Sequence, residues 1–282
     1  MKPRRFEFHS PQSIEDALKL ASDFDDDFIF YAGGTEAIIG MKERVIEAGH
    51  VLNLKKIPRL NQIQMQDGSL HIGALVTHQE IADSEIVKRV LSGYADLSHN
   101  IANIRVRSAG TLAGNLCFAE PNADPPALLA ALNARVVLIG RQGKRDVPVR
   151  EFFDGPYSTV REEAEFMTEI VVPLGAEECR CAYRKVVYLN RPSAGVACVR
   201  NLVDGTPVWE SWAGSITGLP ERLNNVCAVL NERDAVSEFD VMQAAARDMA
   251  GLDVLEGVYG SESYRKHLVA VLAVRSAMEC VK

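Results

Sequence analysis

The sequence predicts an α+β fold in three parts. The first part alternates short apolar runs with a helical pattern, which is typical of a βαβ unit and a small parallel sheet. The middle part has hairpin-like strands and glycine turns, which favour an antiparallel sheet with helices beside it. We therefore expect an α/β subdomain at residues 1–57, an antiparallel-sheet α+β subdomain at 58–175, and a C-terminal domain at 176–282. The C-terminal domain should combine a three-stranded antiparallel sheet with a helical bundle.

Four elements are expected in the first part. Ser13 is a candidate N-cap for a helix whose apolar residues recur every three or four positions. The continuous apolar run at 28–31 is typical of a strand buried on both faces. A helix at 37–42 and a second strand at 50–54 complete the expected order, and Pro58 marks its end.

The elements of the other two parts follow from turn residues and apolar periodicity. Asp67-Gly68 predicts a hairpin turn, and Thr77 is a candidate helix cap. In the middle part, strands are predicted at 70–73, 134–140, 144–149 and 166–172, and helices at 77–81, 86–91, 96–104 and 124–132. In the last part, strands are predicted at 179–187, 196–203 and 208–216, and helices at 223–230, 236–249 and 263–280.

Charge and cysteine usage exclude several functions. The net charge is −7 and basic residues are interspersed with acidic ones, so no basic cluster indicates binding to nucleic acid or to an anionic membrane. The residues after Met1 are polar, and no apolar run is long enough to span a bilayer. We therefore expect a cytoplasmic protein without a membrane span. The six cysteines include no C-x-x-C pair, which argues against an iron–sulfur cluster or a structural zinc in this chain.

A glycine turn, AGGTE at 32–36, follows the apolar run at 28–31. Because Gly33 and Gly34 have no Cβ, their backbone N–H groups can approach a phosphate, and Thr35 can donate its hydroxyl. An ordinary turn between a strand and a helix has the same composition, so this turn alone does not identify a site.

A second glycine turn, GTLAGN, lies at 110–115. Successive N–H groups in such a turn can form a concave anion site, and Thr111 and Asn115 supply side-chain donors. A tight loop between two strands is the alternative. We expect this turn and the one at 32–36 to face each other and to hold one anionic cofactor.

Asp124 precedes Pro125-Pro126 and is therefore predicted to be an N-cap, with proline at the first helical position. Its carboxylate can also accept hydrogen bonds from sugar or polyol hydroxyls, at a distance from any phosphate. The chain has no G-x-G-x-x-G motif and no Walker lysine. Two separated glycine turns around one pyrophosphate indicate instead a flavin dinucleotide held between subdomains.

Together these segments resemble the FAD-binding medium subunit of the molybdenum hydroxylases, the xanthine dehydrogenase and carbon monoxide dehydrogenase family. The turn at 32–35 matches its AGGT motif, and VRSAGTLAGN at 106–115 resembles its pattern I-R-N-x-G-T-I-G-G-N. The resemblance covers nearly all of the chain. Further matches are Ile72-Gly73-Ala74 with Thr77, the D-P-P-A-L-L helix, Val172-Pro173, Tyr183-Arg184-Lys185, and Tyr264-Arg265 with Val271-Leu272 and Arg275 in the last helix.

The resemblance implies FAD as the cofactor of this chain and assigns roles by position. Asp124 would bind ribityl or ribose hydroxyls. Ile101 and Met167 would flank the flavin, or would only pack in the core. Lys185 would lie near the polar edge of the flavin, or would be a solvated strand lysine. The residues that would wrap the pyrophosphate are Phe30, Tyr31, Ala32, Gly33, Gly34, Thr35, Glu36, Ala37, Thr111, Leu112, Ala113, Gly114 and Asn115.

One departure from the family pattern affects the second turn. The family usually has glycine where this chain has Ala113. A methyl group is tolerated there if the residue has a negative φ; otherwise the turn must shift.

The resemblance implies an oxidoreductase subunit that transfers electrons and needs no catalytic acid, base or metal ligand of its own. It would take electrons from the [2Fe–2S] clusters of a small partner subunit, whose complex carries molybdopterin in a large subunit. It would pass them to NAD, a quinone, oxygen or a protein. Two other interpretations stay open: a self-sufficient FAD-dependent oxidoreductase, and a non-catalytic protein of the same fold that has lost flavin.

Overall fold

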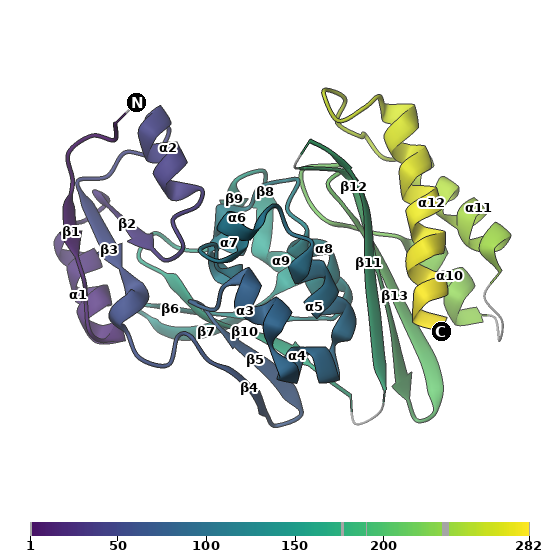
Figure 1. Cartoon of the computed structure of the whole chain (residues 1–282), viewed down its shortest axis with the longest axis horizontal. Helices are drawn as coiled ribbons and strands as arrows, with labels where there is room; N and C mark the ends of the chain where they lie inside the picture. The colour runs from purple at the N-terminus through teal and green to yellow at the C-terminus, as the bar shows by residue number, and fades with distance from the viewer. Residues whose placement is uncertain (1, 176–177, 190, 233–236, 282) are drawn as a thin grey trace.

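The fold is α+β, as the sequence predicts, and Figure 1 shows it as a computed structural model. The structure describes residues 2–175, 178–189, 191–232 and 237–281. Three main sheets follow one another along the long axis of the molecule, in chain order. The division into domains at residues 57 and 175 stays a prediction, and residues 176–177, beside the second boundary, lie outside the described ranges.

The N-terminal sheet is parallel, with the order β1-β3-β2. Ser13 caps the first helix as predicted, because its hydroxyl accepts a hydrogen bond from the backbone N–H of Asp16. Strand β1 was not predicted, since its three residues carry no apolar pattern. The elements are β1 (Glu7–His9), α1 (Ile14–Asp23), β2 (Phe28–Tyr31), α2 (Ala37–Glu43), β3 (His50–Asn53) and the 3₁₀-helix η1 (Leu54–Lys56).

The middle sheet is antiparallel, with the order β4-β5-β10-β6-β7. The sequence predicts four of its strands and misses β4. The register of the central strand β10 against β6 shifts between Met167 and Glu169. The strands are β4 (Ile63–Gln66), β5 (Ser69–Gly73), β6 (Arg135–Gly140), β7 (Gly143–Pro148) and β10 (Phe166–Pro173), with a separate hairpin of β8 (Phe153–Gly155) and β9 (Ser158–Thr159).

Seven helices among the described residues accompany the middle sheet. Thr77 caps α3 as predicted, in a capping box with Glu80. The helix predicted at 96–104 is confirmed only over residues 96–99. Helix α5 ends at residue 99, Ala102 has a positive φ, and Asn103 starts a new helix by capping it. The helices are α3 (His78–Asp83), α4 (Glu85–Val90), α5 (Ser92–His99), α6 (Ile104–Arg107), α7 (Leu112–Phe118), α8 (Pro125–Ala131) and α9 (Val149–Phe152).

The C-terminal part has three long antiparallel strands, as predicted, and a two-residue fourth strand. The helices that follow cover one face of this sheet (Figure 1). Val236, the predicted start of the second helix, lies outside the described residues, which resume at 237. The elements are β11 (Cys179–Tyr188), β12 (Arg191–Val203), β13 (Thr206–Gly214), β14 (Glu221–Arg222), α10 (Asn224–Glu232), α11 (Glu238–Ala250) and α12 (Glu262–Val281).

The largest core joins the middle sheet to the C-terminal sheet. Leu128 of α8 is fully buried there, together with Tyr183, Ala197 and Trp212 from one face of the C-terminal sheet. The other face packs against α10, α11 and α12 in a second core. In the part of the chain that the structure describes, no helix combines the length and the apolar composition needed to cross a membrane.

Replacing Leu128 by alanine should lower the free energy of unfolding by about 2–5 kcal/mol, because the change removes buried methyl groups and leaves a cavity. Urea unfolding of wild type and variant measures the loss. Leu255→Ala is the matched control, since Leu255 is largely exposed and its loss should change stability by less than about 0.5 kcal/mol. Equal stabilities of the two variants would contradict the assigned core.

Candidate cofactor site

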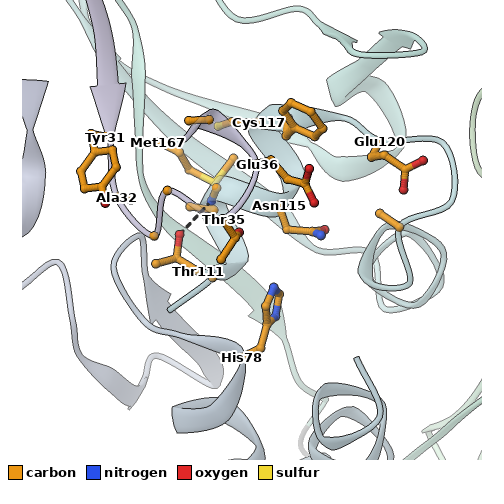
Figure 2. A pocket seen from close by; sticks show the side chains of 18 of the residues that line it. Tyr31, Ala32, Thr35, Glu36, His78, Thr111, Asn115, Cys117, Glu120 and Met167 are labelled. Carbon is orange, nitrogen blue, oxygen red and sulfur yellow. Dashed lines mark hydrogen bonds between the residues drawn. The ribbon is translucent and has the colours of Figure 1, made fainter. Parts of the chain in front are cut away.

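A cavity of about 560 Å³ lies where the N-terminal sheet meets the middle sheet. Its volume is within the range of roughly 300–1,000 Å³ that small-molecule and cofactor sites occupy. The walls come from the end of β2 and the segment 32–37, from α7, and from the start of β10. Figure 2 shows Tyr31 and Glu120 on opposite sides of this cavity, with Thr35 and Asn115 between them.

The two glycine segments touch each other. A Cβ on Gly33 would lie 2.3 Å from the carbonyl oxygen of Ala109 and 2.8 Å from the Cα of Gly110. Gly34 has φ +73°, and a Cβ there would lie 2.4 Å from the ring of Tyr31. Glycine is therefore required at both positions by contact, and at Gly34 also by backbone conformation.

Residues 76–78 hold the second glycine segment in place. The backbone N–H of Leu112 donates to the carbonyl of Val76 at 3.1 Å, and the N–H of His78 donates to the carbonyl of Gly110 at 3.0 Å. Thr77 and Thr111 form an isolated antiparallel β-bridge between these hydrogen bonds. The segment is thus fixed by backbone contacts as well as by its own glycines.

The second segment starts a helix, so the alternative of a tight loop between two strands is wrong. Thr111 is the N-cap of α7, and its hydroxyl accepts a hydrogen bond from the N–H of Gly114 at 3.0 Å. Gly114 and Asn115 therefore lie inside the helix. Ala113 is a buried helical residue and is not among the residues with positive φ, so its methyl group is tolerated.

Polar groups without partners face this cavity. Among the described residues, the backbone N–H groups of Gly33, Gly34 and Thr35 donate to no protein acceptor. The buried oxygens Asn115 Oδ1 and Asp124 Oδ1 likewise have no hydrogen-bond partner there. Buried polar atoms are nearly always satisfied, so the two oxygens fit a ligand with hydroxyls. The three N–H groups belong to partly exposed residues and are free to bind an anionic group of the same ligand.

Asp124 is the N-cap residue of α8, with proline at the first helical position as predicted, but its side chain makes no capping hydrogen bond. Its Oδ2 instead accepts a hydrogen bond from Lys185 Nζ at 2.6 Å, and Lys185 also donates to the carbonyl of Asn100 at 3.0 Å. Burial raises the pKa of Asp124, and the ammonium of Lys185 opposes that rise.

All predicted site residues except Leu112 and Lys185 line the cavity. Leu112 is fully buried in the core, and Lys185 lies behind Asp124. The cavity wall thus includes Ile101 and Met167, which the resemblance places beside the flavin. Direct contact of each residue with FAD stays a prediction.

Several wall residues were not predicted from the sequence, because they come from separate segments. Only His78 could have been found from a local pattern, because it directly follows the predicted helix cap Thr77. Glu120 and Arg191 form an ion pair at 2.7 Å that links the middle part to the C-terminal part. No pattern in the sequence pairs these two residues. The missed charged or polar wall residues are His78, Asn103, Glu120, Asn122, Arg161, Glu163 and Arg191.

Comparison with known proteins identifies the family. The family described as the FAD binding domain in molybdopterin dehydrogenase matches residues 4–175. The chain belongs to this family. The resemblance stated from the sequence is therefore confirmed, and both glycine segments of the cavity lie within the FAD-binding domain.

Relatives of this FAD-binding chain are named as subunits of dehydrogenases and hydroxylases. The carbon monoxide dehydrogenase medium chain of Hydrogenophaga pseudoflava is 37% identical over 186 residues, which span 66% of this chain and 65% of the relative, just under two thirds of its length. The nicotine 6-hydroxylase medium subunit of Paenarthrobacter nicotinovorans is 30% identical over 99% of this chain and 98% of its own length.

A solved structure has the same fold over the whole chain. It is a carbon monoxide dehydrogenase from Hydrogenophaga pseudoflava which lacks the Mo-pyranopterin moiety of the molybdenum cofactor. The TM-score is 0.93 at 30% identity, and the match covers 100% of this chain and 99% of that one. The three-sheet arrangement is thus that of a carbon monoxide dehydrogenase chain.

Replacing Gly33 by valine should abolish FAD retention, because the new side chain would collide with the backbone at Ala109 and separate the two glycine segments. The flavin absorbance of the purified variant, relative to wild type, measures this loss. Gly251→Ala is the control, since a Cβ there would meet nothing within 4 Å. Normal flavin content in Gly33→Val would refute the two-segment site.

Burial lowers the pKa of His78 from its ordinary 6.5 to about 4, and Arg107 adds to the effect. The unfolded chain then binds this proton more tightly than the folded chain. The stability that neutral His78 provides is fully present above pH 6.5 and is lost as pH falls towards 4. Between pH 6.5 and pH 4 the free energy of unfolding should fall by about 3 kcal/mol through this group.

This pH dependence can be measured by urea unfolding of wild type and His78→Gln at pH 7 and at pH 4.5. Glutamine does not titrate, so the variant should lose less stability on acidification than wild type does. Parallel loss in both proteins would show that His78 does not titrate in this window.

Proposed function

We propose that this chain is the FAD-carrying electron-transfer subunit of a molybdenum-containing hydroxylase or dehydrogenase. It takes electrons from [2Fe–2S] clusters in a small partner subunit and passes them to an external acceptor, such as NAD. A large partner subunit carries molybdopterin. The match of residues 4–175 to the FAD-binding family carries this proposal, supported by the cavity between the glycine segments.

The cavity walls suit the two halves of FAD. The N–H groups of Gly33, Gly34 and Thr35 are free to bind a pyrophosphate, where no Cβ of either glycine intervenes. Asp124 Oδ1 is free to accept a hydrogen bond from a hydroxyl, since Lys185 occupies only Oδ2. Ile101 and Met167 offer an apolar wall to the flavin ring.

Bound FAD would supply the redox chemistry, since a flavin accepts electrons one at a time and releases them as a pair. The residues of this chain bind and orient the cofactor. The ion pair of Lys185 with Asp124 keeps a positive charge next to the cavity while satisfying a buried carboxylate. Electron transfer through the flavin needs no acid–base catalyst from this chain.

The alternatives receive less support. A protein that has lost flavin was suggested by Ala113, but this residue is helical and leaves the cavity intact. A self-sufficient flavoenzyme would bind its substrate beside the flavin. The relatives instead carry names of single subunits, medium chain and medium subunit. The domain limits 1–57, 58–175 and 176–282 and a cytoplasmic location remain part of the proposal.

The purified chain should show flavin absorbance but no turnover with typical substrates of molybdenum hydroxylases, such as aldehydes and N-heteroaromatics. Coexpression with the small iron–sulfur subunit and the large molybdopterin subunit of its complex should produce turnover. Reoxidation of the reduced complex by NAD⁺, a quinone or oxygen then identifies the acceptor. The complex built with Gly33→Val is the control, and it should assemble without passing electrons to that acceptor.

Two outcomes would contradict the proposal. Turnover by the isolated chain would support a self-sufficient flavoenzyme. A colourless chain that does not take up added FAD would support a protein of this fold without flavin.

A further inference from the structure

Three side chains with metal-binding groups meet on the N-terminal sheet, outside the cofactor cavity. They are Glu7 and His9 of β1 and His50 of β3. Glu7 and His9 lie two residues apart on one strand and so point to the same face. Glu7 is also the Cα partner of His50 in the parallel register of these strands. The sheet itself therefore brings the three groups together.

The distances between the donor atoms suit one metal ion. His9 Nε2 lies 3.0 Å from His50 Nδ1, and Glu7 Oε2 lies 3.8 Å from each of these nitrogens. In a tetrahedral zinc site with bonds of ~2.0–2.1 Å, neighbouring donor atoms lie about 3.4 Å apart. The observed separations lie on both sides of this value, so small side-chain rotations bring all three donors onto one ion.

Phe24 fixes the two imidazoles before any ion binds. Its ring stacks on His50 with centroids 3.7 Å apart and an angle of 6° between planes, and it also contacts His9 at 4.8 Å. The histidine side chains are mostly buried, whereas the side chain of Glu7 is 75% exposed. Two ligands are thus preorganised, and the third faces solvent, where water can complete the coordination.

We propose that Glu7, His9 and His50 bind a divalent transition-metal ion of the Zn²⁺ type. Two imidazole nitrogens and one carboxylate oxygen form a donor set that zinc accepts, and it is not the oxygen-only set that Mg²⁺ and Ca²⁺ prefer. In the metal-free protein the facing nitrogens share one hydrogen in a single hydrogen bond. When the ion binds, the donor ring carries its hydrogen on its other nitrogen instead, so both facing nitrogens offer a lone pair to the ion.

The ion would clamp the edge of the N-terminal sheet. Strand β1 is an edge strand and is joined to β3 by only three residue pairs. A metal bridge from Glu7 and His9 to His50 would join segments about forty residues apart in the sequence. Binding to the folded state alone then stabilises the protein by mass action.

Isothermal titration of the FAD-loaded, chelator-treated full chain with ZnCl₂ tests the proposal. We expect binding of one ion per chain and a rise in melting temperature with added Zn²⁺. Glu7→Ala and His9→Ala should each weaken binding more than about tenfold, because even the outer partners of metal ligands contribute 10–100-fold. Glu7 is exposed, so its variant should fold normally, and the flavin absorbance of each variant checks the fold.

His71→Ala is the matched control. His71 pairs with Glu169 at 2.9 Å in the middle sheet and lies outside the cluster. Its loss should leave the affinity for Zn²⁺ unchanged. The proposal is overturned if wild type binds no Zn²⁺, or if Glu7→Ala and His9→Ala bind it as tightly as wild type does, since the ion then sits elsewhere.

Discussion

The backbone contact between Gly33 and the peptide at Ala109 and Gly110 determines where everything else in the site lies. The two backbones are closer here than a side chain on Gly33 would permit. This contact joins the N-terminal part of the chain to the middle part. The end of β2 and the start of α7 thereby face one cavity. Backbone N–H groups that a closer-packed interface would cover stay free there to bind an anion.

The C-terminal part supports this cavity from behind. Lys185 reaches from β11 to Asp124, and Arg191 reaches from the start of β12 to Glu120. Both carboxylates lie in the cavity wall, so each ion pair fixes a wall residue to the C-terminal sheet. A buried carboxylate without such a partner would be strongly destabilising. The C-terminal sheet therefore supplies the positive charges that neutralise the two carboxylates of the cavity wall.

The features that depend on neighbouring residues in the chain could be predicted from the sequence. The apolar run of β2, the cap of α3 at Thr77 and the glycine turn after β2 were all visible in the sequence. Long-range contacts were not visible in it. Backbone hydrogen bonds to Val76 and His78 hold residues 110–115 in place, and Asp124 pairs with a lysine 61 positions away. The helix predicted across residues 96–104 ends at residue 99, and the side chain of Asn103 caps a new helix.

The central claim is that the paired glycine segments bind the pyrophosphate of FAD. Titration of the flavin-free chain with FAD and with FMN, followed by fluorescence, tests it most directly. FMN has the same flavin but lacks the adenylate half and the second phosphate. A hydrogen bond to a charged group contributes about 1.5–3 kcal/mol, so FAD should bind more than about tenfold tighter than FMN. Equal affinities for the two flavins would contradict the account.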